Sequence, residues 1–251
     1  MRKSILGLTA LLLATTAAPA FAQDDTDSSG LSVTGGVTLV SDYRFRGFSQ
    51  NGEKAAIQGT INLNHESGFY VGTWASSIDF PDIDGSGNGL TTEIDLYGGY
   101  TTEVSPGLTV DVGLLYYLYP KHVVGNVDTD FFEPYVNVTG TSGPFTLKVG
   151  ANYAWDQSAI GDESAIYLHA EPSVSIPNTP LGLNAHLGWA KSDSFLGGPD
   201  GDVFDYSIGA TAAWKMLTFG VSYVNTDVKR AFGKEAIGAD GAVIFSIGAS
   251  F

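Results

Sequence analysis

The sequence contains no cysteine, which excludes disulfide bonds, thiolate metal sites and a lipid-modified N-terminal cysteine. Beyond its N-terminal segment it also lacks the roughly eighteen consecutive apolar residues that a transmembrane helix needs. Basic residues are scarce, because 12 Lys and Arg stand against 27 Asp and Glu and the formal net charge is −15. A surface this negative repels nucleic acid and acidic substrates, so neither is expected as a partner.

Residues 1–22 are typical of a secretory signal peptide. Arg2 and Lys3 precede an apolar stretch from Ile5 to Ala14, and Ala20-Phe21-Ala22 forms a small-residue cleavage pattern. Cleavage after Ala22 is expected, which predicts export from the cytoplasm. Residues 23–30 are acidic and rich in serine and are predicted to be a short periplasmic leader. Residues 31–251 are predicted to form one domain.

Most of that domain alternates between apolar and polar residues, which is the period of a strand with one apolar face. Residues 108–119 and 145–155 are the clearest examples. The connections also alternate, with tight turns such as Lys215-Met216 and longer polar loops such as 226–240. These features predict an all-β fold, a transmembrane antiparallel up-and-down β-barrel of about twelve strands in the bacterial outer membrane. A secreted soluble β-sandwich would explain the period but not the unequal connections.

Two regions limit the assignment of strand faces. The first alternation runs from Leu31 to Arg46 and predicts that Tyr43 and Phe45 face outward, where aromatic residues would form a ring at the membrane interface. Within residues 69–79 two sets compete for the outer face, so the facing of this strand stays open. The competing sets are Phe69, Val71 and Ala75 on one parity and Tyr70, Trp74 and Ile78 on the other.

The last ten residues, 242–251, alternate strictly and end on Phe251. They resemble the final strand of bacterial outer-membrane barrels, in which the terminal segment is recognised by the barrel-assembly machinery. This resemblance implies that Phe251 is an assembly signal and that the assembly machinery is a partner.

A further resemblance rests on residues 41–50, Ser-Asp-Tyr-Arg-Phe-Arg-Gly-Phe-Ser-Gln, followed by Gly68-Phe69-Tyr70-Val71-Gly72 and Trp74. These motifs are similar to those of the TorF-type family of outer-membrane porins of Gram-negative bacteria, and the similarity covers the whole mature chain. The resemblance implies a barrel fold and an outer-membrane location. It implies no ligand residues.

Charged residues on the polar parity are the candidate pore-lining residues. Arg44 and Arg46 lie next to Asp42, and two interpretations of the arginines stay open. In the first they have a function, either guiding an anionic group or pairing with Asp42 and nearby acids to hold a constriction. Alternatively they are solvated residues paired with lipopolysaccharide phosphates or carboxylates. The excess of acids predicts weak cation selectivity. The candidates are Arg44, Arg46, Glu93, Asp95, Asp111, Glu133, Lys148 and Glu171, with Asp205 as a further inward acid.

Catalytic and metal sites receive little support. His65-x-Ser67 is the only His-x-Ser pair, and it lies in a predicted turn where ordinary turn polarity explains it better than a phospholipase dyad. Asp82, Asp84 and Glu93 have the spacing of a calcium loop without its flanking helices, so this is a weak candidate. The protein is expected not to be an enzyme and to need no cofactor.

The predicted function is a porin-type channel for passive diffusion of small hydrophilic solutes, with lipid and lipopolysaccharide as surroundings. The alternative is a non-conducting barrel with a structural or adhesive role. The sequence leaves the solute, the pore radius and the state of the lumen, open or plugged, undetermined.

Overall fold

The computed structural model describes residues 30–80, 89–120, 123–124, 127–229 and 238–251. The expected signal peptide, residues 23–29 of the leader, and Asp82 and Asp84 of the calcium-loop candidate lie outside these residues. No helix in the described part of the chain is long and apolar enough to cross a membrane.

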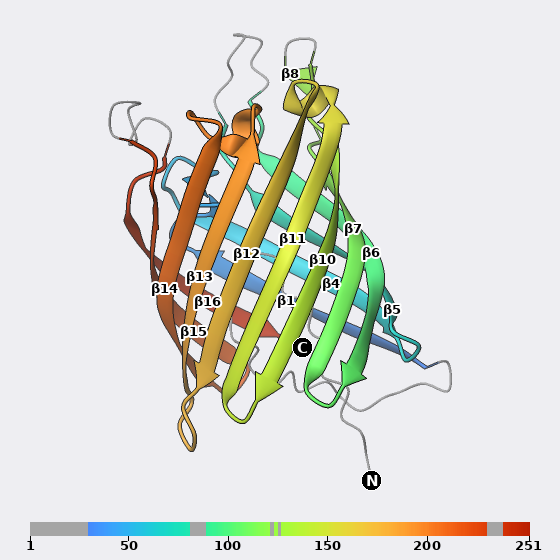
Figure 1. The fold of residues 1–251 in the computed structure, drawn as a ribbon. Helices are drawn as coiled ribbons and strands as arrows, with labels where there is room; N and C mark the ends of the chain where they lie inside the picture. Colours follow the sequence, from blue (N-terminus) through green and yellow to red (C-terminus); the bar gives the residue numbers. More distant parts are fainter. Residues whose placement is uncertain (1–29, 81–88, 121–122, 125–126, 230–237) are drawn as a thin grey trace.

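Twelve strands close into an antiparallel barrel, which confirms the predicted fold class (Figure 1). Alternating residues allow each strand to present one face outward and one inward. The barrel strands are β1 (Leu31–Val40), β4 (Ala56–His65), β5 (Phe69–Ser77), β6 (Thr92–Ser105), β7 (Leu108–Leu118), β10 (Phe131–Ser142), β11 (Phe145–Gln157), β12 (Glu163–Ser175), β13 (Leu181–Ser192), β14 (Asp202–Trp214), β15 (Leu217–Thr226) and β16 (Ala242–Ser250).

Short elements lie in the connections between these strands. They are β2 (Arg44–Phe45), β3 (Phe48–Ser49), β8 (Val123–Val124), β9 (Val127–Asp128) and the 3₁₀ turns η1 (Ser158–Ile160) and η2 (Phe195–Gly197).

The barrel closes where β1 pairs with β16 over residues 36–40 and 246–250. Phe251 extends this pairing, because its backbone N–H and C=O both bond to Gly35, at 2.9 and 3.0 Å. Its side chain remains 59% exposed on the outer surface. Closure leaves no free sheet edge, which a barrel in lipid requires because lipid cannot hydrogen-bond to a strand edge.

The two ends of the barrel differ as the sequence predicts. Short turns at residues 66–68, 106–107, 143–144 and 215–216 gather at the lower end in Figure 1, and the longer connections lie at the upper end. The C-terminus lies at the lower end (Figure 1). Unequal connections of this kind are typical of outer-membrane barrels.

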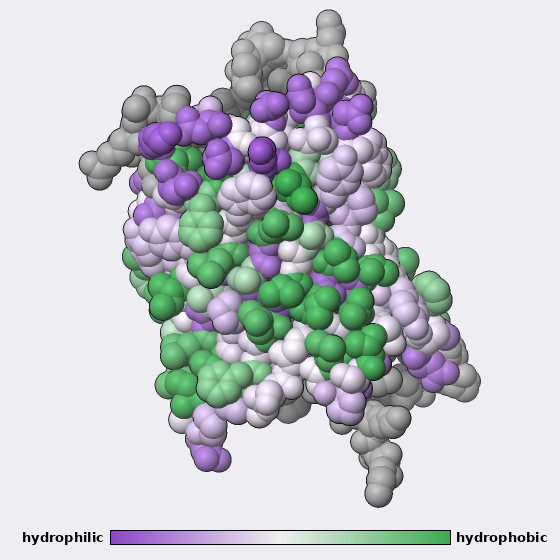
Figure 2. All heavy atoms as spheres, viewed as in Figure 1, coloured by the Kyte–Doolittle hydropathy of each residue, from purple (hydrophilic) through white to green (hydrophobic). Residues whose placement is uncertain are grey.

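The outer surface is an apolar belt between more polar ends (Figure 2). Exposed apolar side chains recur on alternate residues of the strands, such as Leu114, Val149 and Val221, at 43%, 42% and 42% exposure. The open assignment for residues 69–79 is now settled: Phe69 and Val71 face outward, whereas Tyr70 and Trp74 are buried inside. A belt of this kind is compatible with surrounding hydrocarbon.

The prediction that the first strand continues to Arg46 is wrong. β1 ends at Val40, and residues 41–51 fold into the barrel, where β2 and β3 pair as a small hairpin that we call the lumen hairpin. Arg46 and Gly47 form its turn with φ of 48° and 87°. Tyr43 is fully buried and Phe45 packs against the buried cluster, so neither is an outer aromatic. Charged partners inside the barrel stabilise this inward fold.

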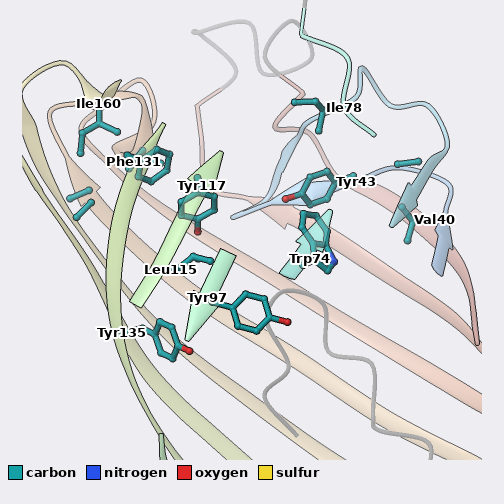
Figure 3. Packing of buried hydrophobic residues seen from close by; sticks show 14 of the residues in the cluster. Val40, Tyr43, Trp74, Ile78, Tyr97, Leu115, Tyr117, Phe131, Tyr135 and Ile160 are labelled. Atoms are coloured by element: carbon teal, nitrogen blue, oxygen red, sulfur yellow. The ribbon is translucent and has the colours of Figure 1, made fainter. Parts of the chain in front are cut away.

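Aromatic side chains fill much of the upper lumen around the lumen hairpin (Figure 3). The Tyr43 ring lies 5.3 Å from that of Trp74, and Tyr117 stacks on Phe131 with ring centroids 4.4 Å apart. Phe45 meets Tyr117 edge to face at 5.8 Å. Such contacts stabilise the packing beyond the area they bury, and here they narrow the barrel interior.

Candidate functional site: the barrel lumen

Arg44 anchors the lumen hairpin at the upper end of the barrel. Its Nε donates to Asp42 at 2.5 Å, and its Nη1 donates to the carbonyls of Gly238 and Asp240, at 2.5 and 3.1 Å. The loop before β16 is thereby held against the loop after β1. Among the arrangements that the sequence allowed, this is the pairing with a nearby acid.

Arg46 reaches across the lumen to Glu133 on β10. Its Nη2 donates to both carboxylate oxygens, at 2.6 and 2.8 Å, and both side chains are almost completely buried. The same carboxylate accepts hydrogen bonds from Tyr117 and Asn152, each at 3.1 Å. Burial by itself lowers the pKa of Arg46, but the Glu133 carboxylate outweighs this and the net shift is upward. The guanidinium therefore stays charged inside the barrel.

Two acids on β6 lie behind the lumen hairpin. Glu93 accepts a hydrogen bond from the Tyr43 hydroxyl at 3.2 Å and is only 2% exposed. Asp95 is fully buried, and neither of its carboxylate oxygens has a hydrogen-bond partner among the described residues. Both acids point inward as the alternation predicts, but the hairpin and its aromatic residues cover them.

Asp111 on β7 belongs to a separate polar group. It accepts hydrogen bonds from Tyr70 at 2.7 Å and from the side-chain amide of Asn137 at 3.4 Å, and the Tyr70 and Tyr135 hydroxyls also contact each other. These hydrogen bonds satisfy the buried carboxylate. The tyrosines here fill the lumen, which is the ordinary role of inward side chains in a narrow barrel.

The opposite wall, on β11 to β14, combines basic, acidic and aromatic side chains. Glu171 pairs with Lys148 at 2.7 Å and with His169 at 3.0 Å. His186 Nε2 lies 3.0 Å from Asp205, and the Tyr167 hydroxyl lies 2.7 Å from the same nitrogen. The rings of Tyr167, His169 and His186 are nearly parallel, with centroids 5.7 to 6.3 Å apart.

A cavity of about 110 Å³ lies between this wall and the lumen hairpin. Its charged lining comprises Arg44, Arg46, Lys148, Glu171 and Asp205, together with the two histidines. Gly150 on β11 makes room beside it, because a Cβ there would collide with Asn137 Oδ1 and with the His169 ring. None of the candidate acids Glu93, Asp95, Asp111 and Glu133 lines this cavity.

The structure thus divides the predicted pore-lining residues into three groups. Arg44, Arg46, Lys148 and Glu171 meet at one cavity, and Glu133 joins them through its pair with Arg46. Glu93 and Asp95 are set apart behind Tyr43, and Asp111 belongs to the Tyr70 group. The prediction omitted His169, His186 and Tyr167, although their position on the polar parity of the strands placed them inside.

The weak catalytic and metal candidates gain nothing from the geometry. His65 Nδ1 lies 2.6 Å from Ser67 Oγ and accepts from the Ser67 backbone N–H at 3.1 Å, so both residues are engaged within one exposed turn. Glu93 faces the lumen and bonds to Tyr43. No group of three or more His, Asp or Glu side chains within the described ranges is placed to hold a metal ion.

Comparison with known proteins gives one family and several similar folds. A family profile described as "Bacterial protein of unknown function (Gcw_chp)" matches residues 24–251. No curated protein sequence matches the chain.

Among solved structures, the NanC porin is similar with a TM-score of 0.56 and 10% identity, over 88% of this chain and 99% of that one. The KdgM porin, solved in complex with disordered oligogalacturonate, is similar with a TM-score of 0.52 and 6% identity, over 87% and 97% of the two chains. At such low identity, these similarities establish the barrel fold and nothing finer.

Proposed function

This chain belongs to the Gcw_chp family of bacterial proteins of unknown function, and we propose that it is an outer-membrane, porin-type channel for passive diffusion of small hydrophilic solutes. The observation that carries the proposal is a charged, hydrogen-bonded lumen inside a barrel with an apolar exterior. Burying this many charges costs free energy, and an apolar interior would give a more stable barrel if the interior only had to be filled. We also propose that the protein is not an enzyme.

The proposal includes the route to the membrane and the surroundings there. Residues 1–22 serve as the signal peptide, and Phe251 serves as the signal read by the barrel-assembly machinery. Membrane lipid surrounds the apolar belt, and lipopolysaccharide surrounds the upper end. The motif at residues 41–50, which suggested the TorF-type porins, is the segment that forms the lumen hairpin, and the finer relationship to that family is part of the proposal.

Planar-bilayer recording tests conduction directly. Purified, folded protein is expected to give discrete conductance steps. A preparation with an intact barrel by circular dichroism that never gives such steps would favour the alternative, a non-conducting barrel with a structural or adhesive role.

The lumen hairpin is expected to limit the conductance. Replacing residues 42–51 with a Gly-Ser linker of equal length should raise the single-channel conductance severalfold, because the hairpin places aromatic and charged side chains across the lumen. The same replacement at residues 193–201, another connection at the upper end, is the control and should leave the conductance near the original value. Equal effects of the two replacements would show that the hairpin is not the constriction.

Ion selectivity is a finer part of the proposal. The net charge of −15 favours cations near the barrel, and the pairing of Glu133 and Glu171 with basic partners keeps the preference weak. Reversal potentials under a salt gradient should therefore favour cations slightly. This preference should fall as salt rises, because the Debye length shortens from about 8 Å at physiological ionic strength to about 3 Å at 1 M. An anion-favouring value would reject this part while leaving the channel itself intact.

A further inference from the structure

The cavity beside Arg46 contains polar groups whose hydrogen bonds are incomplete. Arg46 Nη2 is occupied by Glu133, but its buried Nη1 has no hydrogen-bond partner among the residues that the structure describes. Asn137 lines the same cavity, and its buried Oδ1 likewise has no hydrogen-bond partner within the described ranges. Nearly all buried polar groups in folded proteins are satisfied, so a donor and an acceptor left open at one cavity call for a ligand or for ordered water.

The open hydrogen-bonding groups at the cavity, rather than its net charge, select the kind of ligand. Its three basic residues are each paired with an acid, Arg44 with Asp42, Arg46 with Glu133 and Lys148 with Glu171. Arg46 nevertheless keeps one N–H group that bonds to none of the described residues. A guanidinium with a free N–H prefers a carboxylate, with which it forms strong charge-assisted hydrogen bonds. An open amide oxygen needs a donor, such as a hydroxyl group. A cavity of about 110 Å³ limits the ligand to a small molecule.

We propose that this cavity binds a small hydroxy acid, with the carboxylate on Arg46 and the hydroxyl group donating to Asn137 Oδ1. The inference rests on the proposed function, because it names a class of solute for the same channel. The Arg46 guanidinium lies 4.2 Å from the centre of the Tyr167 ring, and this contact stabilises it beside the cavity. Arg46 lines the cavity, and in this proposal a small movement of its side chain turns the buried Nη1 toward the ligand carboxylate.

A local site for an acid is compatible with weak cation selectivity overall. Selectivity for small ions depends on the summed field of the whole barrel and its loops, whereas binding depends on groups within a few ångströms, where screening is slight. A negatively charged channel would otherwise repel an acidic solute. The site around Arg46 therefore supplies the local attraction that passage of such a solute requires.

The test measures binding of sodium lactate to the folded protein in a non-ionic detergent, by saturation-transfer NMR on the lactate methyl group. Lactamide, which lacks the charge, and propionate, which lacks the hydroxyl group, are the matched probes. Lactate is expected to bind most tightly, with propionate severalfold weaker and lactamide about tenfold weaker. Equal binding of lactate and lactamide would overturn the proposal.

Substitutions locate the site within the lumen. Arg46→Gln should weaken lactate binding about tenfold. This variant leaves Glu133 without its cation and could fail to fold, so lactate binding is also measured with Glu133→Gln. That change releases Arg46 from its ion pair and should tighten lactate binding. Glu93→Gln removes the same charge behind Tyr43 and should change nothing. If Glu133→Gln and Glu93→Gln change lactate binding equally, the effect depends only on the net charge of the protein and the site is rejected.

The binding measurement and the conductance measurement fail independently. Conductance steps without lactate preference would reject only the hydroxy-acid site. If the protein binds lactate in preference to lactamide but gives no conductance steps, the channel is rejected. The cavity is then not the solute site of a channel.

Discussion

Replacing Arg46 with methionine is expected to lower the free energy of unfolding by about 3 to 5 kcal/mol, the usual cost of removing one member of a buried ion pair. Glu133 would lose its cation while remaining almost fully buried, at 1% side-chain exposure. The hydrogen bonds from Tyr117 and Asn152 cannot supply the missing charge. The measurement is reversible urea unfolding of the barrel from lipid vesicles, followed by tryptophan fluorescence.

A double variant separates the lost pair from general damage to the lumen. Arg46→Met combined with Glu133→Gln should recover most of the loss, because a neutral amide at position 133 still bonds to Tyr117 and needs no counter-charge. If the double variant is as unstable as the single one, the cost comes from packing of the lumen hairpin and the ion pair contributes little.

Arginine placed on the lipid-facing side of a strand should cost about 2 to 4 kcal/mol near the middle of the bilayer. Val221 and Ser222 are neighbours in the middle of β15, so they share a depth, but Val221 is 42% exposed on the outer face and Ser222 points inward. Val221→Arg should therefore be strongly destabilising, whereas Ser222→Arg should cost much less. The reason is that lipid cannot solvate the guanidinium, while the polar lumen can.

The same unfolding experiment from vesicles measures both variants, with Val221→Ala and Ser222→Ala as size controls. Equal losses for the two arginine variants would mean that β15 does not expose one face to lipid.

The pore residues divide between those that the sequence placed correctly and those that it grouped wrongly. Alternation along each strand predicted that Glu133, Lys148 and Glu171 face inward, because residues two apart lie on the same side of a strand. It could not predict which inward residues meet, since Arg46 and Glu133 are 87 positions apart in the chain. Summing all inward acids therefore predicted one acidic lumen, whereas the structure separates Glu93 and Asp95 from the cavity lined by Arg46 and Lys148.

The expectation that acidic solutes are excluded came from the same kind of sum. A net charge of −15 describes the field far from the protein, and it remains a sound argument against nucleic acid. It does not describe a cavity where Arg46 has an open donor, because interactions over a few ångströms outweigh distant charges that water screens.

The sequence by itself determined the barrel: alternation with period two, unequal connections and the strict pattern of residues 242–251 predicted about twelve strands and the faces of most of them, with the facing of residues 69–79 left open. Only the tertiary structure decided the course of residues 41–51, whose alternation continues that of β1 although the chain turns inward after Val40. The physical reason is that alternation specifies one polar side and one apolar side but not what covers each. In β1 the apolar side is left for lipid, whereas Tyr43 and Phe45 are covered by other aromatic side chains inside the barrel, and Arg44 and Arg46 find their partners on distant segments.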